Sequence, residues 1–355
     1  MTAATPGSPV PTWSRYLRSV RRVRPAWWGA VAIVIITLVT VSSQSAYNIY
    51  IYNSMLLACM GAISLQVLQG TTGLPSIGTA AFLLFGAFGS VWFLRQGVPF
   101  PLDLVGGALF AGVAGIIFGI PALRLRGLFF ALSTLSAHFI AVFLGNFYQK
   151  QVPEGTHGFS IPILFGSYDL ETARRYTAWM MCAIVALLVL VVSRLMQERS
   201  GRALRMIRDH EHIAPTLGIA VARYKLLVFT LTSVVIGLEG ALLARLNGLA
   251  SAENYTVALA FQYIAMIVIG GLGSLPGAVI GATIVVGLPA VLPDLITPLM
   301  GESQANADGP NFALIIYGLL VIFVVSSSPD GAIGLARSVA SRFTRAVAAI
   351  DRTKR

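Results

Sequence analysis

The residue types that could carry out chemistry are sparse in this chain, and they do not form an enzymatic pattern. No HExxH, GxSxG or paired-cysteine metal motif occurs. His210 and His212 are two residues apart, so on a helix they point to different sides and make a poor metal pair. Cys59 and Cys182 each stand alone inside an apolar run, which indicates neither a disulfide framework nor a zinc site. The residues therefore predict a chain that is not itself catalytic and holds no metal.

ATP binding by this chain is also excluded by residue type. A phosphate-binding loop requires Gly-Lys-Ser/Thr, because its lysine must reach the phosphates. The three lysines, Lys150, Lys225 and Lys354, follow Gln, Tyr and Thr. We therefore expect no cofactor on this chain, and any ATP and Mg²⁺ that drive it must be bound by partner subunits.

Polar side chains within apolar segments point to a different kind of chemistry, the passage of a polar solute. Thr134 and His138 fall in one apolar segment and Glu239 in another. A carboxylate or imidazole in lipid is costly, so it usually faces a bundle interior or a water-filled route. Glu239 lies about eight residues from the outer end of its segment. Two alternatives therefore remain open: the carboxylate lines the solute path, or its side chain snorkels outward to the membrane surface.

Two glycine-rich stretches interrupt the apolar pattern, GTTGLPSIGTAAF at 70–82 and GGLGSLPGAVIGA at 270–282. Interrupted backbone at a membrane boundary often borders a translocation path. Small residues equally suit close helix crossing, and both interpretations can hold. The residues predicted to border the solute path are Gly73, Ser76, Gly78, Thr134, His138 and Glu239.

The elements that must position these groups are long apolar helices. Of 355 residues, 56% are hydrophobic and 11% charged, against about 25% charged in a soluble domain, and the mean hydropathy is +0.78. We expect an all-α integral membrane protein, in which short segments at 79–94 and 277–292 could be broken or re-entrant. About ten transmembrane helices are predicted, at roughly 26–43, 47–69, 79–94, 102–123, 127–148, 176–196, 223–246, 257–272, 277–292 and 311–327.

Basic residues set the orientation of these helices. If ten helices start inside, the N-terminal tail, 124–126, 194–225 and the tail after Pro329 face the cytoplasm and hold 20 of the 25 Lys and Arg residues. Basic loops of membrane proteins stay on the cytoplasmic side. Both termini are therefore expected to be cytoplasmic, and the formal net charge of +11 needs no nucleic-acid partner.

The predicted organisation has three parts. A cytoplasmic tail at 1–25 precedes a transmembrane domain at 26–328, and a basic cytoplasmic tail occupies 329–355. Because the run from 26 to 43 has spanning length and many others follow, it is expected to be a retained helix and not a secretory signal. Two long outer connections, 149–175 and 293–310, are either solvated loops or docking surfaces.

Residues 202–213 are expected to form a short amphipathic helix between two spans, within a cytoplasmic region at 197–222. Its apolar side on a helical wheel comprises Ala203, Leu204, Met206, Ile207 and Ile213. The other, outward side comprises Arg202, Arg205, Arg208, Asp209 and His212. Pro215 and Gly218 would end it before the next membrane entry. Such a helix either floats in lipid headgroups or docks on a cytoplasmic partner.

Four motifs, spread over about residues 30–330, resemble one family. They are RLRGLFFALSTL at 124–135, EGTHGF at 154–159, SGRALRMIRDHEHIAPTLGIAVARYKLLVF at 200–229 and IGGLGSLPGAVIGA at 269–282. This set is similar to the permease subunits of branched-chain amino acid ABC transporters, the LivM-like group. The resemblance implies that 26–328 is a permease domain, half of an importer's pathway.

The resemblance also implies partners and contact residues. The partners would be a LivH-like second permease, two ABC ATPase subunits (LivG-like and LivF-like), an extracytoplasmic solute-binding protein and the lipid bilayer of a prokaryotic cytoplasmic membrane, which the chain crosses several times. The expected ATPase-coupling residues are Arg202, Arg205, Arg208, Asp209, His210, Glu211, Pro215 and Gly218. The expected outer-loop contacts are Gly155, Thr156, His157 and Gly158.

Some residues depart from the family's pattern, namely His138, Glu239 and the Thr156–His157 pair. They leave the solute open among a branched-chain amino acid, urea, a short amide and an aromatic acid. A zwitterion would use backbone N–H groups at broken helix ends around 73–78 for its carboxylate. The alternative function is an autonomous proton-coupled secondary transporter in which Glu239 and His138 titrate.

Overall fold

The computed structural model describes residues 45–152, 155, 157–166 and 168–300, together with the isolated positions 37, 315, 318, 319 and 322. For residues 291–300 it describes the backbone alone. The two predicted tails lie outside the described residues. So do nearly all of the spans expected at 26–43 and 311–327.

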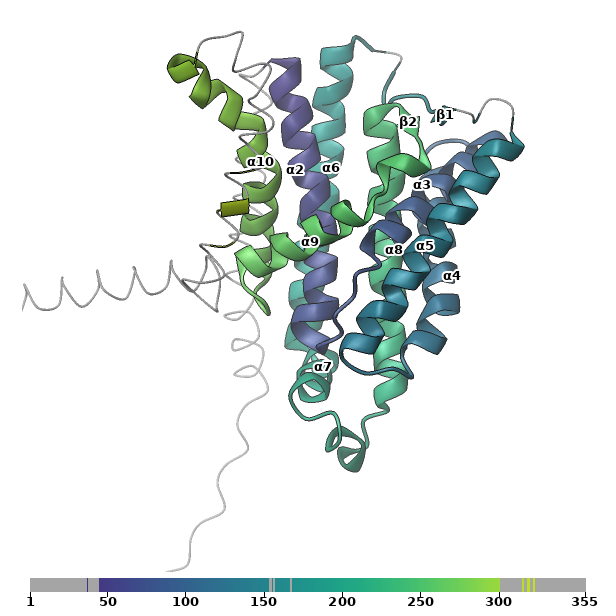
Figure 1. Cartoon of the computed structure of the whole chain (residues 1–355), viewed down its shortest axis with the longest axis vertical. Helices are drawn as coiled ribbons and strands as arrows, with labels where there is room; N and C mark the ends of the chain where they lie inside the picture. The colour runs from purple at the N-terminus through teal and green to yellow at the C-terminus, as the bar shows by residue number, and fades with distance from the viewer. Residues whose placement is uncertain are drawn as a thin grey trace, which may run out of the picture.

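Helices account for most of the described chain (Figure 1). The α-helices are α2 (Ala46–Leu65), α3 (Thr79–Arg95), α4 (Leu102–Ala122), α5 (Leu128–Gln151), α6 (Leu170–Gln197), α7 (Arg199–Asp209), α8 (Val221–Asn247), α9 (Val257–Gly270) and α10 (Leu275–Met300). The shorter elements are the π-helical turn η1 (Gln66–Thr71), the 3-10 turns η3 (Ala214–Leu217) and η4 (Ala252–Asn254), and the strands β1 (Phe159–Ser160) and β2 (Leu249–Ala250).

Six helical segments of the described chain are long and apolar enough to cross a membrane, and they confirm the predicted helical membrane architecture. They are Ala46–Thr71, Leu102–Ala122, Leu128–Gln151, Leu170–Gln197, Val221–Asn247 and Ala252–Gly270. Apolar helices at Thr79–Arg95 and Leu275–Ala290 are shorter. The count of ten stays a prediction.

The packing centre of the bundle is α3, whose residues 79–91 are all buried. Glycines let its neighbours approach: a Cβ built on Gly86 would lie 1.9 Å from the carbonyl oxygen of Gly237 in α8, and one on Gly240 would lie 2.0 Å from that of Leu83. A Cβ on Gly107 of α4 would lie 2.4 Å from the Gly86 oxygen. Helices α3, α4 and α8 therefore cross through backbone contact, as small residues permit in membranes.

The two ends of the bundle carry different features. Figure 1 shows α7 at one end and β1 and β2 at the other. The strands pair antiparallel, Phe159 with Ala250 and Ser160 with Leu249, and this two-residue ladder is a small departure from the predicted all-α fold. Segments 149–175 and 194–225, predicted to face opposite sides of the membrane, therefore lie at opposite ends of the molecule.

The amphipathic helix differs from the prediction at both ends. It spans Arg199–Asp209 instead of 202–213, because the backbone leaves helical geometry at His210 (φ −143°, ψ 65°). Ile213, predicted on its apolar side, lies beyond the helix and is 50% exposed.

Candidate translocation and coupling site

The first glycine-rich stretch is a break between α2 and α3. Helix α2 switches to a π-turn at Gln66, and the chain runs without regular structure from 73 to Gly78, the N-cap of α3. Gln69 Nε2 donates to the carbonyl oxygen of Ser76 at 2.7 Å, and the Gly78 N–H donates to the buried Ser76 hydroxyl at 3.3 Å. Non-helical backbone at this depth is thus satisfied by protein, as a membrane interior demands.

Two residues predicted to border the path, Thr134 and Gly78, are in contact. The Ile77 N–H donates to Thr134 Oγ1 at 3.0 Å, and Thr134 Oγ1 donates to the Ala131 carbonyl at 2.9 Å. A Cβ on Gly78 would lie 2.9 Å from the Thr134 carbonyl oxygen. Helix α5 therefore braces the break directly.

The second glycine-rich stretch forms the turn between α9 and α10 and packs against the first. Gln66 Nε2 donates to the Gly271 carbonyl at 3.2 Å, and a Cβ on Gly70 would lie 2.7 Å from the Gly273 nitrogen. Further along, a Cβ on Gly270 would lie 2.0 Å from the Gly277 carbonyl oxygen, across the α9–α10 hairpin. The stretch thus serves both as a break and as a helix crossing.

Glu239 is buried between helices, which argues against one of the two alternatives left open for it, a side chain that snorkels outward. Its side chain is 0% exposed. Tyr263 of α9 donates a hydrogen bond to Oε1, and a Cβ on Gly61 of α2 would lie 2.3 Å from Oε2. Oε2 has no hydrogen-bond partner among the described residues. The carboxyl group therefore sits where α2, α8 and α9 meet.

His138 is buried on α5, with 2% of its surface exposed. Its Nδ1 finds no hydrogen-bond partner among the residues that the structure describes, and its ring stands at 5.8 Å from that of Phe139. No hydrogen bond or ion pair within the described residues joins His138 to Glu239.

Helix α7 packs on the bundle through one side. Leu204 and Ile207 are each 1% exposed. Arg202 and Arg205 fold back on the preceding helix, donating to the carbonyls of Gln197 and Met196 at 3.1 Å in each case. Arg208 is exposed, as predicted, and it also donates to the Gly70 carbonyl in the first break.

The α7–α8 loop, residues 210–220, carries the rest of the predicted coupling set. Glu211 is held within the chain, 2.7 Å from Lys225 Nζ and 3.9 Å from Arg126 Nε. Gly218 ends η3 in the left-handed region (φ 77°). Asp209, His210 and Pro215 are exposed, and Leu217 beside Gly218 is 65% exposed. The tip of the loop therefore presents apolar side chains to a partner or a surface.

The predicted outer-loop residues do not act as one group. Gly155 is buried, and its carbonyl accepts from Gln149 Nε2 at 3.1 Å. Gly158 is buried at φ 94° against β2, and His157 is exposed. Thr156 lies outside the described residues. Of the described members, His157 alone offers an accessible side chain.

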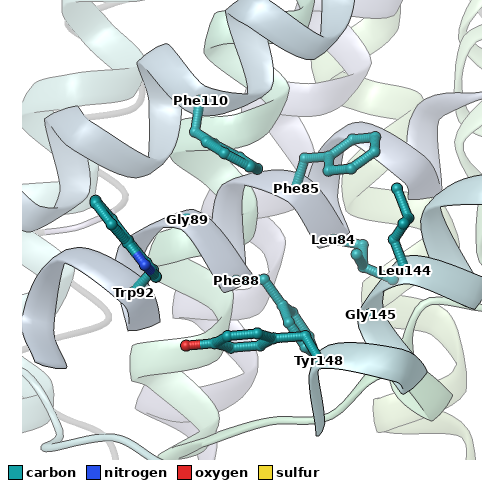
Figure 2. Close-up of a pocket in the computed structure, with 9 residues that line it drawn as sticks. All are labelled: Leu84, Phe85, Phe88, Gly89, Trp92, Phe110, Leu144, Gly145 and Tyr148. Carbon is teal, nitrogen blue, oxygen red and sulfur yellow. The ribbon is translucent and has the colours of Figure 1, made fainter. Parts of the chain in front are cut away.

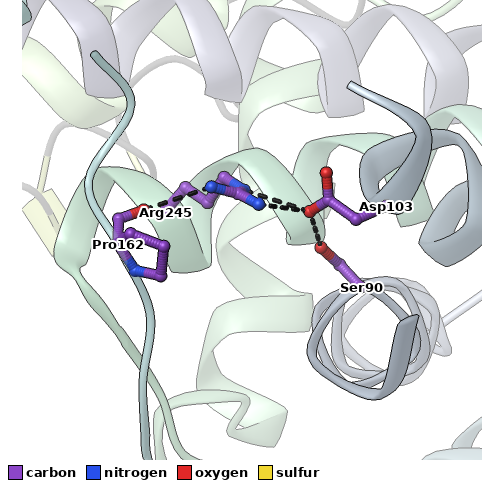
Figure 3. A network of polar contacts seen from close by, with 4 residues as sticks. All are labelled: Ser90, Asp103, Pro162 and Arg245. Atoms are coloured by element: carbon purple, nitrogen blue, oxygen red, sulfur yellow. Dashed lines mark hydrogen bonds and ion pairs between the residues drawn. The ribbon is translucent and has the colours of Figure 1, made fainter. Parts of the chain in front are cut away.

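A buried ion pair at the same end was missed at the sequence level (Figure 3). Arg245 of α8 contacts Asp103 Oδ2 through Nη2 at 2.5 Å and Nε at 3.2 Å, and it donates to the Pro162 carbonyl at 3.2 Å. Ser90 of α3 donates to the same carboxylate oxygen at 2.9 Å. The sequence does contain a signal for this pair, because Asp103 and Arg245 carry opposite charges and both stand near the outer ends of predicted apolar segments. The pair ties α3, α4, α8 and the β1 segment together.

An apolar cavity of about 550 Å³ lies between α3, α4 and α5. Figure 2 shows its lining side chains, among them Phe85, Phe88, Trp92, Phe110 and Tyr148. No charged residue lines it, and an amino acid would bury its carboxylate and ammonium there without partners, at high cost. The cavity therefore suits an apolar occupant and not a zwitterion.

These features define a multi-pass membrane protein whose helices are interrupted at one end, next to an amphipathic helix. The family model described as "Branched-chain amino acid transport system / permease component" matches residues 47–325. The chain therefore belongs to this family of transport permeases.

Its relatives are named as permeases of one kind of system. The high-affinity branched-chain amino acid transport system permease protein LivM of Escherichia coli (strain K12) is 26% identical over 301 residues, covering 78% of this chain and 67% of that protein. A probable LivM of Methanocaldococcus jannaschii is 24% identical, covering 65% and 67%. The LivH permease protein of Escherichia coli (strain K12) is 27% identical, covering 57% and 64%. The predicted LivM-like resemblance is confirmed.

Proposed function

We propose that this chain is a permease subunit of an ABC importer for branched-chain or related amino acids, and that it forms half of the pathway. The observation that carries the proposal is the contact of α7, through Arg208, with the two glycine-rich breaks, at the end of the bundle opposite β1 and β2. The partners would be a LivH-like permease, two ATPase subunits that bind ATP and Mg²⁺, and an extracytoplasmic binding protein. Similarity to both LivM and LivH relatives supports a two-permease pathway.

The loop tip is the proposed ATPase contact. Ile213 and Leu217 are exposed by 50% and 65%, although apolar side chains on an aqueous loop gain from burial. A cationic surface helix could also rest in lipid headgroups, and Arg202 and Arg205 stay exposed although each donates to a carbonyl of α6. The apolar side chains Ile213 and Leu217 at the tip are the part of the loop that a protein groove would bury.

The breaks are the proposed border of the solute path. An amino acid needs donors for its carboxylate, and the start of α3 beside Gly78 offers backbone N–H groups and the positive end of a helix dipole. His138 and Glu239, which the alternative proton-coupled mechanism would use, sit on helices α5 and α8 without a described hydrogen bond between them. The geometry supports the partner-driven mechanism better.

Reconstitution tests the proposal. The chain is purified with its permease and ATPase partners in proteoliposomes, and uptake of labelled leucine is measured with and without ATP and binding protein. We expect uptake only when all components and ATP are present. Uptake by the chain alone, driven by a pH gradient, would show the secondary-transporter alternative to be right.

A substitution at the loop tip tests the ATPase contact. Leu217→Asp should leave the chain folded, because the side chain is 65% exposed, but should release the ATPase subunits from the purified complex. Gln96→Asp places the same charge on an exposed residue after α3 and should retain them. Full retention of the ATPases by Leu217→Asp would remove the tip from the proposed contact.

A further inference from the structure

The Arg208 side chain lies at the junction of three segments that are far apart in the sequence. Its Nη1 donates to the Gly70 carbonyl at the end of η1. A Cβ built on Gly73 would lie 3.2 Å from Arg208 Cγ, and one on Gly273 would lie 3.3 Å from Arg208 Nη1. One arginine of α7 therefore touches both glycine-rich breaks, while the residue as a whole is exposed.

The two breaks are built to be held together. Gly73 and Gly273 have φ angles of 69° and 90°, which glycine adopts at little cost, and neither has a side chain that would keep Arg208 away. The backbone of Gly70 packs directly on that of Gly273. A guanidinium is a planar group with several donors, so it can bridge two backbone segments where an ammonium would reach one.

Helix α7 is attached to α6 by packing and to α8 through one ion pair. Buried Leu204 and Ile207 hold it on the bundle, and the backbone at Gly201, whose Cβ would lie 2.5 Å from the Met196 backbone, packs closely on the end of α6. On its other side, Glu211, two residues beyond α7, pairs with Lys225 of α8 at 2.7 Å, and the rest of the loop contains a single short 3-10 turn. A displacement of α7 can therefore reach α8 through this ion pair, and it can reach the breaks separately through Arg208.

We propose that Arg208 is a latch, the positioning residue that carries a displacement of α7 directly to the inner end of α2 and to the α9–α10 turn. The proposal rests on the proposed function, because the displacement comes from an ATPase partner. Through the latch, movement of α7 shifts both breaks together, so that the solute path that they border opens or closes by a route separate from the Glu211–Lys225 pair on α8.

Methionine in place of Arg208 tests the latch, since it retains an unbranched apolar stem and removes every donor. Arg208→Met is assayed in the purified full complex, and its solute-stimulated ATP hydrolysis is expressed relative to its own basal hydrolysis. Its solute-stimulated hydrolysis and uptake should fall about tenfold or more, within the usual range of coupling between sites. The matched control is Arg194→Met, which removes the same charge from an exposed cytoplasmic-side residue. Stimulated hydrolysis by Arg208→Met within twofold of this control would overturn the latch.

Arg208→Lys keeps the test valid if Arg208→Met does not assemble. Lysine retains the charge and can reach the Gly70 carbonyl as a single point donor. We expect the ratio of solute-stimulated to basal ATP hydrolysis to be about threefold or more lower in Arg208→Lys than in the unsubstituted chain, which is a modest loss of coupling. An unchanged ratio would overturn the proposal.

A distance measurement reads the latch without relying on activity. Spin labels at Arg199→Cys on α7 and Leu272→Cys in the α9–α10 turn, both exposed residues, are introduced in a chain with Cys59→Ser and Cys182→Ser. We expect the same label separation with and without nucleotide when Arg208 is present, and a nucleotide-dependent separation in Arg208→Met. Equal nucleotide dependence in both chains would overturn the latch. Absence of ATPases from the unsubstituted complex would instead remove the proposed function, and the latch with it.

Discussion

Replacement of Asp103 by asparagine should lower the free energy of unfolding by about 3–5 kcal/mol, because it leaves a buried guanidinium without its counter-charge. Asp103 is 0% exposed and Arg245 4%. The carboxylate accepts from Arg245 Nε and Nη2 and from Ser90, so one substitution disturbs three contacts (Figure 3). Arg245→Met should cost a similar amount, since it leaves the carboxylate with the serine hydroxyl alone.

The double variant Asp103→Leu/Arg245→Met separates the ion pair from general damage to packing. Replacing both members of a buried pair by apolar residues is often nearly neutral, so we expect the double variant to be more stable than either single variant by about 2 kcal/mol. The free energy of unfolding is measured by denaturing-detergent titration in mixed micelles, followed by tryptophan fluorescence. Ser90→Ala, which removes one hydrogen bond, should cost about 1 kcal/mol. The single variant Asp103→Leu completes the cycle, and losses of Asp103→Leu and Arg245→Met that add within about 0.5 kcal/mol in the double variant would refute the reasoning.

Three further outcomes follow from the packing of α8. Gly237→Leu should destabilise the bundle by about 1–3 kcal/mol or prevent its folding, since a Cβ there would lie 2.3 Å from the Ala111 Cβ. Its melting temperature is compared with that of Ala222→Leu, at an exposed position of the same helix. Equal melting temperatures would contradict the close crossing of α4 and α8 at Gly237. Glu239→Gln should keep stability within about 1 kcal/mol because its amide oxygen can still accept from Tyr263, as a thermal melt would report. Glu239→Leu should lose about 1–3 kcal/mol by leaving that hydroxyl unpaired, and a loss no larger than that of the Gln variant would contradict this assignment.

The helices themselves were largely predictable, because lipid imposes a strong apolar signal over each span. Predicted 79–94 became Thr79–Arg95, and predicted 102–123 became Leu102–Ala122. Helix α6 begins at Leu170, six residues before its predicted start at 176. Its first turns carry charged residues, and Arg175 pairs there with Glu171, one turn earlier in the helix. Those solvated turns lack the apolar signal, so hydropathy alone could not include them.

Contacts between distant segments were not predictable in the same way. Arg208 and Gly70 are separated by 138 residues, and Arg245 and Asp103 by 142. A helical wheel placed Arg208 on the outward side of its helix, and the residue is indeed exposed. The wheel could not show its bond to Gly70, because it contains no information about the break that packs beside it. Which helices are neighbours is set by glycine crossings such as Gly86 on Gly237, and such pairs leave no local pattern in a single sequence.

The short ladder between β1 and β2 constrains the order in which the chain can be assembled. Its strands are separated by helices α6 and α8, each long enough to cross the bilayer, with α7 between them at the opposite end. Phe159 cannot meet Ala250 until both crossings have been inserted and the chain has returned to the side from which it left. The ladder therefore closes late in biogenesis, and a crosslink between these two strands would report whether a nascent chain has acquired its correct topology.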